Sequence, residues 1–398
     1  MNKKNTLTGF ICFLVLYETA CWMSMDAFTP ALPSIKSSFE VSFRVVQLTI
    51  TLWMAGGLLP QILIGPLSDR FGRKPILLIG AALFVVTSLA CAYAQSFHQL
   101  LLARFFQGMV IPSMIIAGYA AVHELCDQKQ AIQVVARMQS VTLLAPSIGP
   151  LLGGLLLTYT LWPAIFWCLS LWGAISFMGL AYVMPESLPY HQRNPALNLV
   201  SSFKQYGQCI SNHVFMLYSC AMCGLLAIIV IWVSASPLLI IDHFHCSALT
   251  FGLSQVFVFG AFIIGTKLIS RLSKQHTQYQ SVITYGSLIT ILGGLSFLLS
   301  SLALYDQLLP MILCMMMVMV GLGSCFSVFM RLAIDSSDES MGIKMGMISL
   351  LQTIIATCSS VVVVIFFHNT VLSLALLIMI SAFIPMLTIP FLNRQSQD

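Results

Sequence analysis

The chain has 398 residues, of which 58% are hydrophobic and only 8% are charged. An ordinary soluble domain carries about 25% charged residues, so this composition excludes a soluble globular fold. The net charge of +5 comes from positive residues in short loops between apolar runs, and it therefore does not indicate a nucleic-acid partner.

Apolar runs of about 20 residues, the length that crosses a hydrocarbon core, recur along the whole sequence. The alternating segments that are typical of membrane strands do not occur in it. The sequence therefore predicts an all-α membrane protein with twelve transmembrane helices. In chain order these cover residues 8–32, 45–66, 75–95, 99–122, 134–158, 161–183, 214–241, 249–269, 280–301, 308–331, 345–367 and 370–392.

The first run follows Lys3 and Lys4, as the apolar core of a signal peptide would. It is longer than such a core, it contains Glu18 and Asp26, and no convincing small-x-small cleavage site follows it. We therefore expect a retained first helix.

The positions of Lys and Arg predict the orientation, because short cytoplasmic loops carry the excess of positive charge. If both termini are cytoplasmic, Lys36 and Arg44 fall outside and Arg104 lies within a span. The other positive residues all fall inside or at that membrane edge, so we expect cytoplasmic termini. They are Lys3, Lys4, Arg70, Arg73, Lys74, Lys129, Arg137, Arg193, Lys204, Lys267, Arg271, Lys274, Arg331, Lys344 and Arg394.

The longest polar interruption, residues 184–213, separates six expected spans from six. We predict an N-terminal bundle over 1–183, a cytoplasmic linker over 184–213 and a C-terminal bundle over 214–398. Weak internal symmetry favours this division, since Gly65 opens a basic loop after the second span and Gly265 opens another after the eighth. Paired bundles of this kind are typical of transporters.

Most of the 12 cysteines are single residues within spans, where Cys acts as a small apolar filler. Cys220 and Cys223 lie one helical turn apart, but no His or second pair accompanies them. The run HELCD at 123–127 lacks the second His of a zinc-protease helix. We therefore expect no metal, no cofactor and no enzymatic activity.

The loop GPLSDRFGRKP at 65–75 is the most specific stretch of the sequence. Gly65 and Gly72 allow a tight turn between helices, and Asp69 can pair with Arg70 or Arg73. An ordinary positive loop is the alternative, but the complete arrangement resembles the signature loop of the major facilitator superfamily.

Two further stretches resemble motifs of that superfamily's proton-coupled drug exporters. LLARFFQGM at 101–109 is similar to the fourth-helix motif, with Arg104, Gln107 and Gly108 in place. APSIGPLLGG at 145–154 is similar to the fifth-helix antiporter motif, and it predicts a bent helix with a smooth glycine face. A glycine face that serves packing alone is the alternative. This motif supplies Pro146, Gly149, Pro150 and Gly153.

The stretch YETACWMSMDAFTP at 17–30 resembles the first helix of MdfA-type multidrug/proton antiporters, a group within the same superfamily. The resemblance extends over residues 10–160. It implies the major facilitator fold, with two bundles of six helices.

Carboxylates inside a membrane span are costly and therefore indicate function. Glu18 and Asp26 lie eight residues apart, which places them about 12 Å apart along a helix and lets them border one cavity without touching. Arg104 should lie at the depth of Asp26, so we expect a link between these two, shared by Gln107 one turn away. These four residues are the expected proton-coupling groups. For Glu18, a hydrogen-bonded residue without a transport role remains an alternative.

A cavity for lipophilic molecules needs aromatic and flexible apolar side chains. We expect Trp22, Met25, Met138 and Trp232 to bind substrate, Met138 by resemblance to the MdfA-type group. Plain helix packing is the alternative for each of the four.

The resemblance implies a proton-coupled antiporter that exports lipophilic neutral or cationic drugs across the bacterial inner membrane by alternating access. The expected partners are small-molecule drugs, protons and the lipid bilayer, with no nucleic acid, and we expect a functional monomer. An exporter of one dedicated metabolite, such as a siderophore or a sugar-like compound, is the alternative. A receptor or scaffold is disfavoured, because the loops are too short to hold a partner domain.

Overall fold

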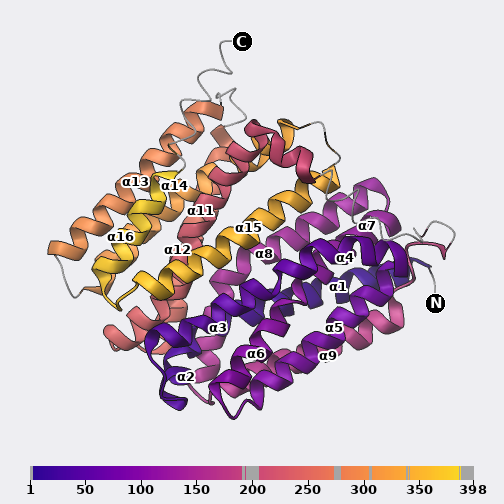
Figure 1. Cartoon of the computed structure of the whole chain (residues 1–398), viewed down its shortest axis with the longest axis horizontal. Coiled ribbons are helices and arrows are strands. Elements are labelled where there is room, and N and C mark those ends of the chain that lie inside the picture. Colours follow the sequence, from indigo (N-terminus) through magenta and orange to yellow (C-terminus); the bar gives the residue numbers. More distant parts are fainter. Residues whose placement is uncertain are drawn as a thin grey trace. The chain divides into compact units, whose positions relative to one another are not determined.

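The computed structural model describes residues 3–190, 193, 206–272, 279–303, 307–337, 339, 341–384 and 386. Every element in this part of the chain is helical (Figure 1), which confirms the all-α prediction. Within it, ten helices are long and apolar enough to cross a membrane, or eleven if one bent pair forms a single span. The shorter apolar helix Val371–Ala382 lies where the twelfth span is expected. The count of twelve and the cytoplasmic termini stay predictions.

The chain divides into two compact units. The first contains Met1–Glu40 and Leu48–Ser201, and the second contains Val41–Gln47 and Ser202–Asp398. Residues 191–192 and 194–205 of the expected linker lie outside the described residues, so the linker stays a prediction.

The first unit is built from helices that follow one another through short breaks. They are α1 (Lys3–Asp26), η1 (Thr29–Ala31), α2 (Leu32–Ser38), α3 (Phe43–Gly56) from Leu48 onward, α4 (Leu58–Phe71), α5 (Arg73–Ala92), α6 (Phe97–Gly108), η2 (Ser113–Gly118), α7 (Tyr119–Leu125), α8 (Gln128–Leu157) and α9 (Pro163–Val183).

Helix α5 shows how these helices divide their surface between protein and lipid. Ile79, Leu83 and Val86 recur at helical spacing and are about half exposed. The opposite face buries Phe84 and Ser88 inside the unit. An apolar stripe that faces outward is expected of a helix in hydrocarbon, because burying it in protein gains nothing there.

A break in the first span follows Asp26, the last residue of α1. Pro30 has no backbone N–H and cannot donate to the carbonyl of Asp26, four residues earlier. That carbonyl accepts a hydrogen bond from Thr29 Oγ1 at 2.9 Å instead. The proline therefore ends the regular helix at the carboxylate, and the hydroxyl beside it satisfies the freed oxygen.

Helix α8 is bent by 48° between Gln133–Thr142 and Leu144–Leu157. Pro146 removes the hydrogen bond to the carbonyl of Thr142, which is the physical cause of such a bend. The bent helix that the fifth-helix motif predicts is therefore confirmed.

The second unit is also helical. It contains α11 (His213–Pro237), η4 (Leu238–His243), α12 (Ala248–Leu272), α13 (Tyr279–Ala303), α14 (Leu308–Asp335), α15 (Met341–Phe366) and α16 (Val371–Ala382). Helices α12 and α14 approach closely at Gly323, where an added Cβ would meet the carbonyl oxygen of Phe262. Small residues at such crossings let helices pack in the absence of a hydrophobic driving force.

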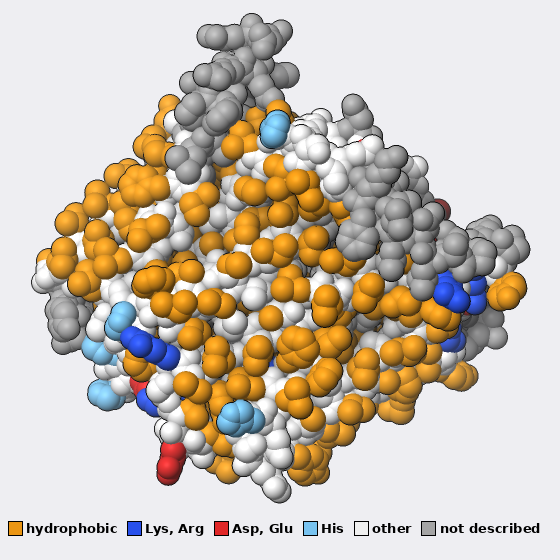
Figure 2. Space-filling view, in the orientation of Figure 1, with side chains coloured by type: hydrophobic (Ala, Val, Ile, Leu, Met, Phe, Trp, Pro, Cys, Tyr) orange, Lys and Arg blue, Asp and Glu red, His pale blue; other side chains and the backbone are white. Residues whose placement is uncertain are grey.

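Hydrophobic side chains cover most of the face that Figure 2 shows, and Lys, Arg, Asp and Glu appear mainly near its edge. On a soluble protein such a surface would cause aggregation. On this chain it is the surface that contacts lipid.

Replacing Leu83, at the middle of the 20-residue α5, by Asp should disfavour membrane insertion of α5 by about 3 kcal/mol on insertion scales. The measurement is the inserted fraction of α5 in a translocon insertion assay. Tyr93→Asp, at the exposed end of the same helix, is the control and should cost much less. Equal losses would contradict a position for Leu83 at the middle of a membrane span.

Candidate functional site

Arg104 of α6 is completely buried in the first unit. Its Nη1 donates to the carbonyl of Ser24 at 2.8 Å and to Gln107 Oε1 at 2.6 Å. Gln107 Nε2 in turn donates to Ser88 Oγ on α5 at 2.8 Å. The guanidinium therefore belongs to a polar chain that joins α1, α6 and α5, and the expected contact between Arg104 and Gln107 is present.

The expected link between Arg104 and Asp26 is absent. No ion pair or hydrogen bond joins these two described side chains, and Arg104 Nε and Nη2 have no hydrogen-bond partner. The guanidinium carbon lies 4.4 Å from the centre of the Phe28 ring instead. The reason is local: the helix breaks after Asp26, and the side chain that reaches Arg104 is Phe28, two residues further on.

Asp26 lies against the glycine face of α8 and is almost fully buried. A Cβ added to Gly149 would come within 2.5 Å of the Asp26 Cβ, and one at Gly153 would meet the carbonyl oxygen of Ala27. The smooth face predicted from the fifth-helix motif therefore packs against the segment that carries the carboxylate. Pro146 bends α8 one turn before this contact, and Pro150 follows Gly149 directly.

Glu18 is fully buried and faces α7 and α8. Its Oε1 accepts hydrogen bonds from Tyr119 Oη at 3.1 Å and from Thr142 Oγ1 at 3.3 Å, while Oε2 has no partner. Thr142 and Gly149 lie on the same helix, so α8 contacts the surroundings of both carboxylates. Glu18 and Asp26 do not touch, as their spacing predicts.

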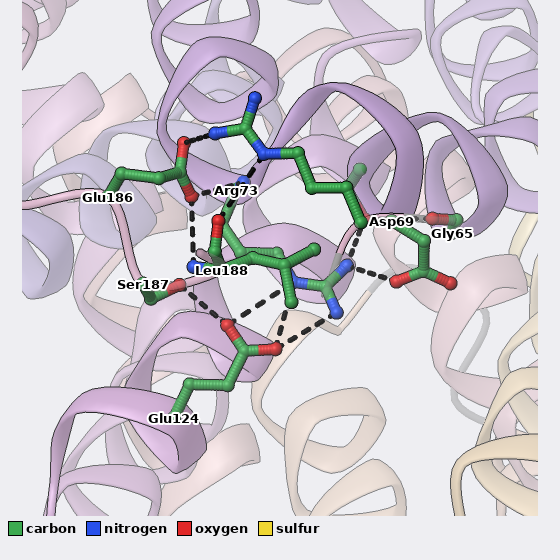
Figure 3. Close-up of polar contacts among 9 residues, drawn as sticks. Gly65, Asp69, Arg73, Glu124, Glu186, Ser187 and Leu188 are labelled. Carbon is green, nitrogen blue, oxygen red and sulfur yellow. Dashed lines mark hydrogen bonds and ion pairs between the residues drawn. The ribbon is translucent and has the colours of Figure 1, made fainter. Parts of the chain in front are cut away.

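The loop between α4 and α5 is held by Arg73, which lies between two carboxylates in Figure 3. Its guanidinium pairs with Asp69 on α4 and with Glu124 on α7, the latter at 3.0 Å. Nη1 also donates to Ser68 Oγ at 2.6 Å, and Ser187 Oγ donates to Glu124 Oε2 at 2.6 Å. The predicted pairing of Asp69 is therefore made with Arg73.

A third carboxylate, Glu186, fastens the chain after α9 to the same loop (Figure 3). Its Oε1 accepts from the backbone N–H of Arg73 at 2.9 Å, and its Oε2 pairs with Arg193 Nη2 at 3.4 Å. Gly72, between α4 and α5, has φ of +100°, and an added Cβ would collide with Glu186 Oε2. Both the turn and the carboxylate therefore require glycine at this position.

The other two motif residues of this loop play smaller parts. Arg70 is exposed and lies over the ring of Phe71 at 5.2 Å. The carbonyl of Gly65 accepts from Ser68 Oγ at 2.9 Å, and space beside its Cα is open.

The four expected substrate-binding residues are buried or partly buried. Met138 lies one turn before Thr142 on α8, and Met25 and Trp22 lie on α1. Trp22 Nε1 has no hydrogen-bond partner. Trp232 belongs to the second unit, where its Nε1 donates to Gln255 Oε1 at 2.8 Å.

An apolar furrow of about 570 Å³ lies between α1, α8 and α9 of the first unit. Ala27, Gly153 and Trp172 of α9 form part of its lining. None of the four expected substrate-binding residues lines this furrow. Its lining suits an apolar molecule or a lipid chain rather than a charged one.

Several site residues escape sequence reasoning. Ser24 contributes a backbone carbonyl, and Phe28 looks like any apolar residue of a span, so neither carries a recognisable signal. Glu124 and Glu186 do have a signal, because each is an acid beside a span whose neighbouring loops are mainly basic.

The helices and the buried charges define a polytopic α-helical membrane protein. The family model described as Major Facilitator Superfamily matches residues 14–358. The multidrug transporter MdfA of Yersinia pestis bv. Antiqua (strain Angola) is 34% identical over 341 residues, 85% of this chain and 83% of that protein. The multidrug resistance protein MdtM of Salmonella typhimurium is 29% identical over 397 residues, 99% of this chain and 95% of that protein.

Among solved structures, a D-xylose-proton symporter has a TM-score of 0.75 at 15% identity, covering 95% of this chain and 97% of that one. This likeness concerns the fold. The chain belongs to the major facilitator superfamily, a family of transporters. It is a multi-span protein of the bacterial inner membrane.

Replacing Gly149 by Ala should lower the stability of the purified protein by about 1–3 kcal/mol, because the new methyl group overlaps Asp26 and α8 must move away. Thermal unfolding in detergent measures this. Gly260→Ala on α12, where a Cβ meets open space, is the control and should be neutral or stabilising. Similar behaviour of both variants would contradict the close contact.

A double-mutant cycle with Arg73→Gln and Glu124→Gln should give a coupling energy of about 1 kcal/mol, since the pair is mostly shielded from water. Denaturant unfolding of the four proteins provides the measurement. The exposed Arg331 and Asp335 pair is the control and should give a coupling near zero. Equal coupling in the two pairs would show that the loop network adds no stability.

Proposed function

We propose that this chain is a secondary active transporter that exports lipophilic neutral or cationic drugs across the inner membrane in exchange for protons. The observation that carries the proposal is the burial of Glu18 and Asp26 within one membrane span. Neither forms an ion pair with a described residue. A carboxyl group kept at such cost in a span is a candidate proton carrier.

The relatives support the choice of cargo. MdfA and MdtM are named as multidrug proteins, and the match covers most of this chain. Their names favour a broad range of drugs over one dedicated metabolite. The likeness to a sugar symporter concerns the fold and carries no argument about substrate.

In the proposed cycle, Asp26 is the main proton site and Glu18 is a second acid that also attracts cationic drugs. Burial disfavours the carboxylate, and a nearby guanidinium favours it. A small movement between Asp26 and Arg104 would therefore decide whether the proton is held or released, and Gln107 would orient Arg104. Proton and drug would compete, so that each is bound while the other is absent.

Substrate would be bound by apolar and aromatic side chains, for which we propose Trp22, Met25, Met138 and Trp232. Hydrogen bonds from Tyr119 and Thr142 hold one oxygen of Glu18 near α8, and the other oxygen is buried without a hydrogen bond. Lipophilic cations suit such a site, since aromatic rings and a carboxylate both attract positive charge.

Alternating access would come from the two bundles, residues 1–183 and 214–398, exposing the site to opposite membrane faces in turn. The Arg73 network joins the ends of α4, α5 and α7 and the chain after α9, so the first bundle can move as one body. Within one chain both bundles are present, and we propose that the monomer is the working unit.

Transport of tetraphenylphosphonium into proteoliposomes under an imposed pH gradient tests this proposal. Wild type should accumulate the cation only with the gradient, and Asp26→Asn should reduce gradient-driven accumulation by at least about tenfold. Glu18→Gln should weaken transport of the cation more than that of a neutral drug, because one negative charge is lost. Arg104→Ala should lose coupling while still binding the cation.

Asp127→Asn serves as the control, because Asp127 is an exposed N-cap of α8 and Asn caps a helix equally well. Its transport should match wild type. Full gradient-driven transport by Asp26→Asn would refute the role of Asp26. Wild-type transport that does not depend on the pH gradient would refute antiport.

A further inference from the structure

The charge of Arg104 is stabilised in an unusual way. The side chain is wholly buried, only Nη1 makes hydrogen bonds, and both acceptors of those bonds are neutral groups. No described carboxylate pairs with it. A buried charge without such a partner must be stabilised by something else.

Aromatic rings surround the guanidinium. Its carbon lies 4.4 Å from the centre of the Phe28 ring, 5.7 Å from Trp53 on α3 and 5.9 Å from Phe166 on α9. The face of an aromatic ring attracts a cation, and the attraction is strongest when both are removed from water. Phe28 is the nearest of the three rings, and it packs on Phe166 at 5.4 Å between ring centres.

Phe28 and Asp26 are two residues apart on the segment where the first span breaks. The Asp26 side of this segment lies against Gly149 of α8, whereas the Phe28 ring lies over Arg104. The two side chains therefore leave the segment on different sides. A rotation of this segment that brings one toward Arg104 takes the other away.

We propose that Phe28 is a positioning residue that binds the Arg104 guanidinium in place of Asp26, so that ring and carboxylate are alternative partners of one cation. With Arg104 held on the ring, Asp26 lacks a counter-charge and can hold a proton. When the segment moves and Arg104 reaches Asp26, the carboxylate is favoured and the proton leaves. This inference rests on the proposed proton coupling, and it assigns Phe28 as the residue that competes with Asp26 for Arg104.

Among the described residues, the other groups around Arg104 do not provide an alternative counter-charge. From α5 the neutral Ser88 hydroxyl and the Cys91 thiol face the site, from α6 the Gln107 amide, and from α1 the Ser24 carbonyl. Glu18 is engaged with Tyr119 and Thr142.

The test replaces Phe28 by phenylalanines with one, two and three ring fluorines in the full chain. Fluorine weakens the attraction of the ring for a cation but hardly changes its size. The measurement is the pH at which tetraphenylphosphonium binding to the purified protein is half lost as protons compete. Each fluorine should favour the contact between Arg104 and Asp26, so this pH should fall stepwise, by about one unit over the series.

The same series at Phe84 is the matched control, because Phe84 is equally buried in the first unit but packs on Tyr17. The pH midpoint of binding should not shift across the Phe84 series. When Arg104 is replaced by Met, the midpoint should no longer shift across the Phe28 series either. A flat Phe28 series in the wild-type background, or one that persists without Arg104, would overturn the proposal. Tetraphenylphosphonium binding to the wild type that does not depend on pH would instead count against the proposed proton coupling.

A measurement independent of transport and binding completes the test. Phe28→Leu, Arg104→Met and the double variant form a double-mutant cycle, measured by denaturant unfolding. The unfolding equilibrium constant of the double variant should be about tenfold smaller than the product of the two single effects predicts. Independent effects of the two changes would mean that the ring does not hold the guanidinium, whatever the transport data show.

Discussion

The burial of the Arg104 guanidinium is the constraint on which the polar interior of the first unit depends. A charge inside a membrane span is costly, so the surrounding helices must supply what water would supply. Here α1 gives a carbonyl, α6 an amide, and Phe28 after α1, α3 and α9 give aromatic faces. None of these groups carries a formal charge, and this leaves Asp26 without the cation that sequence reasoning assigns to it.

Arg73 shows the other way in which this chain stabilises an arginine. At the loop between α4 and α5 its guanidinium pairs with Asp69 and Glu124 and makes a further hydrogen bond to Ser68. Charged partners cost little desolvation free energy there, since the loop lies at the end of the spans and water is available during folding. The two arginines are therefore stabilised differently: Arg73 binds helix ends together through charged partners, while Arg104 is held by neutral groups and aromatic rings, and in the proposed cycle it can change partner.

Helix breaks lie close to both buried acids. Pro30 ends α1 at Asp26, and Pro146 bends α8 near the residue that donates to Glu18. Between these breaks, Gly149 and Gly153 let α8 approach the carboxylate segment to backbone contact. A larger residue at either glycine would hold the two segments further apart, because a Cβ atom would separate the backbones.

The sequence by itself determined the membrane class, the helical fold and the family, because each rests on local chemistry. Apolar runs of spanning length, the prolines that break them and the turn glycine Gly72 act over a few residues and can be read in order. The same reasoning brought Glu18, Asp26, Arg104 and the loop acid Asp69 to attention, since a charge in or beside a span is conspicuous.

Only the tertiary structure decided the partners. The ring of Phe28, the carbonyl of Ser24 and the hydroxyls of Tyr119 and Thr142 are ordinary groups whose importance comes from what they face. Depth along a span predicts that Asp26 and Arg104 lie at the same level, but depth does not give the rotation of a helix about its axis. That rotation is set by the break at Pro30 and by packing on the glycines of α8, and it turned the ring rather than the carboxylate toward the cation.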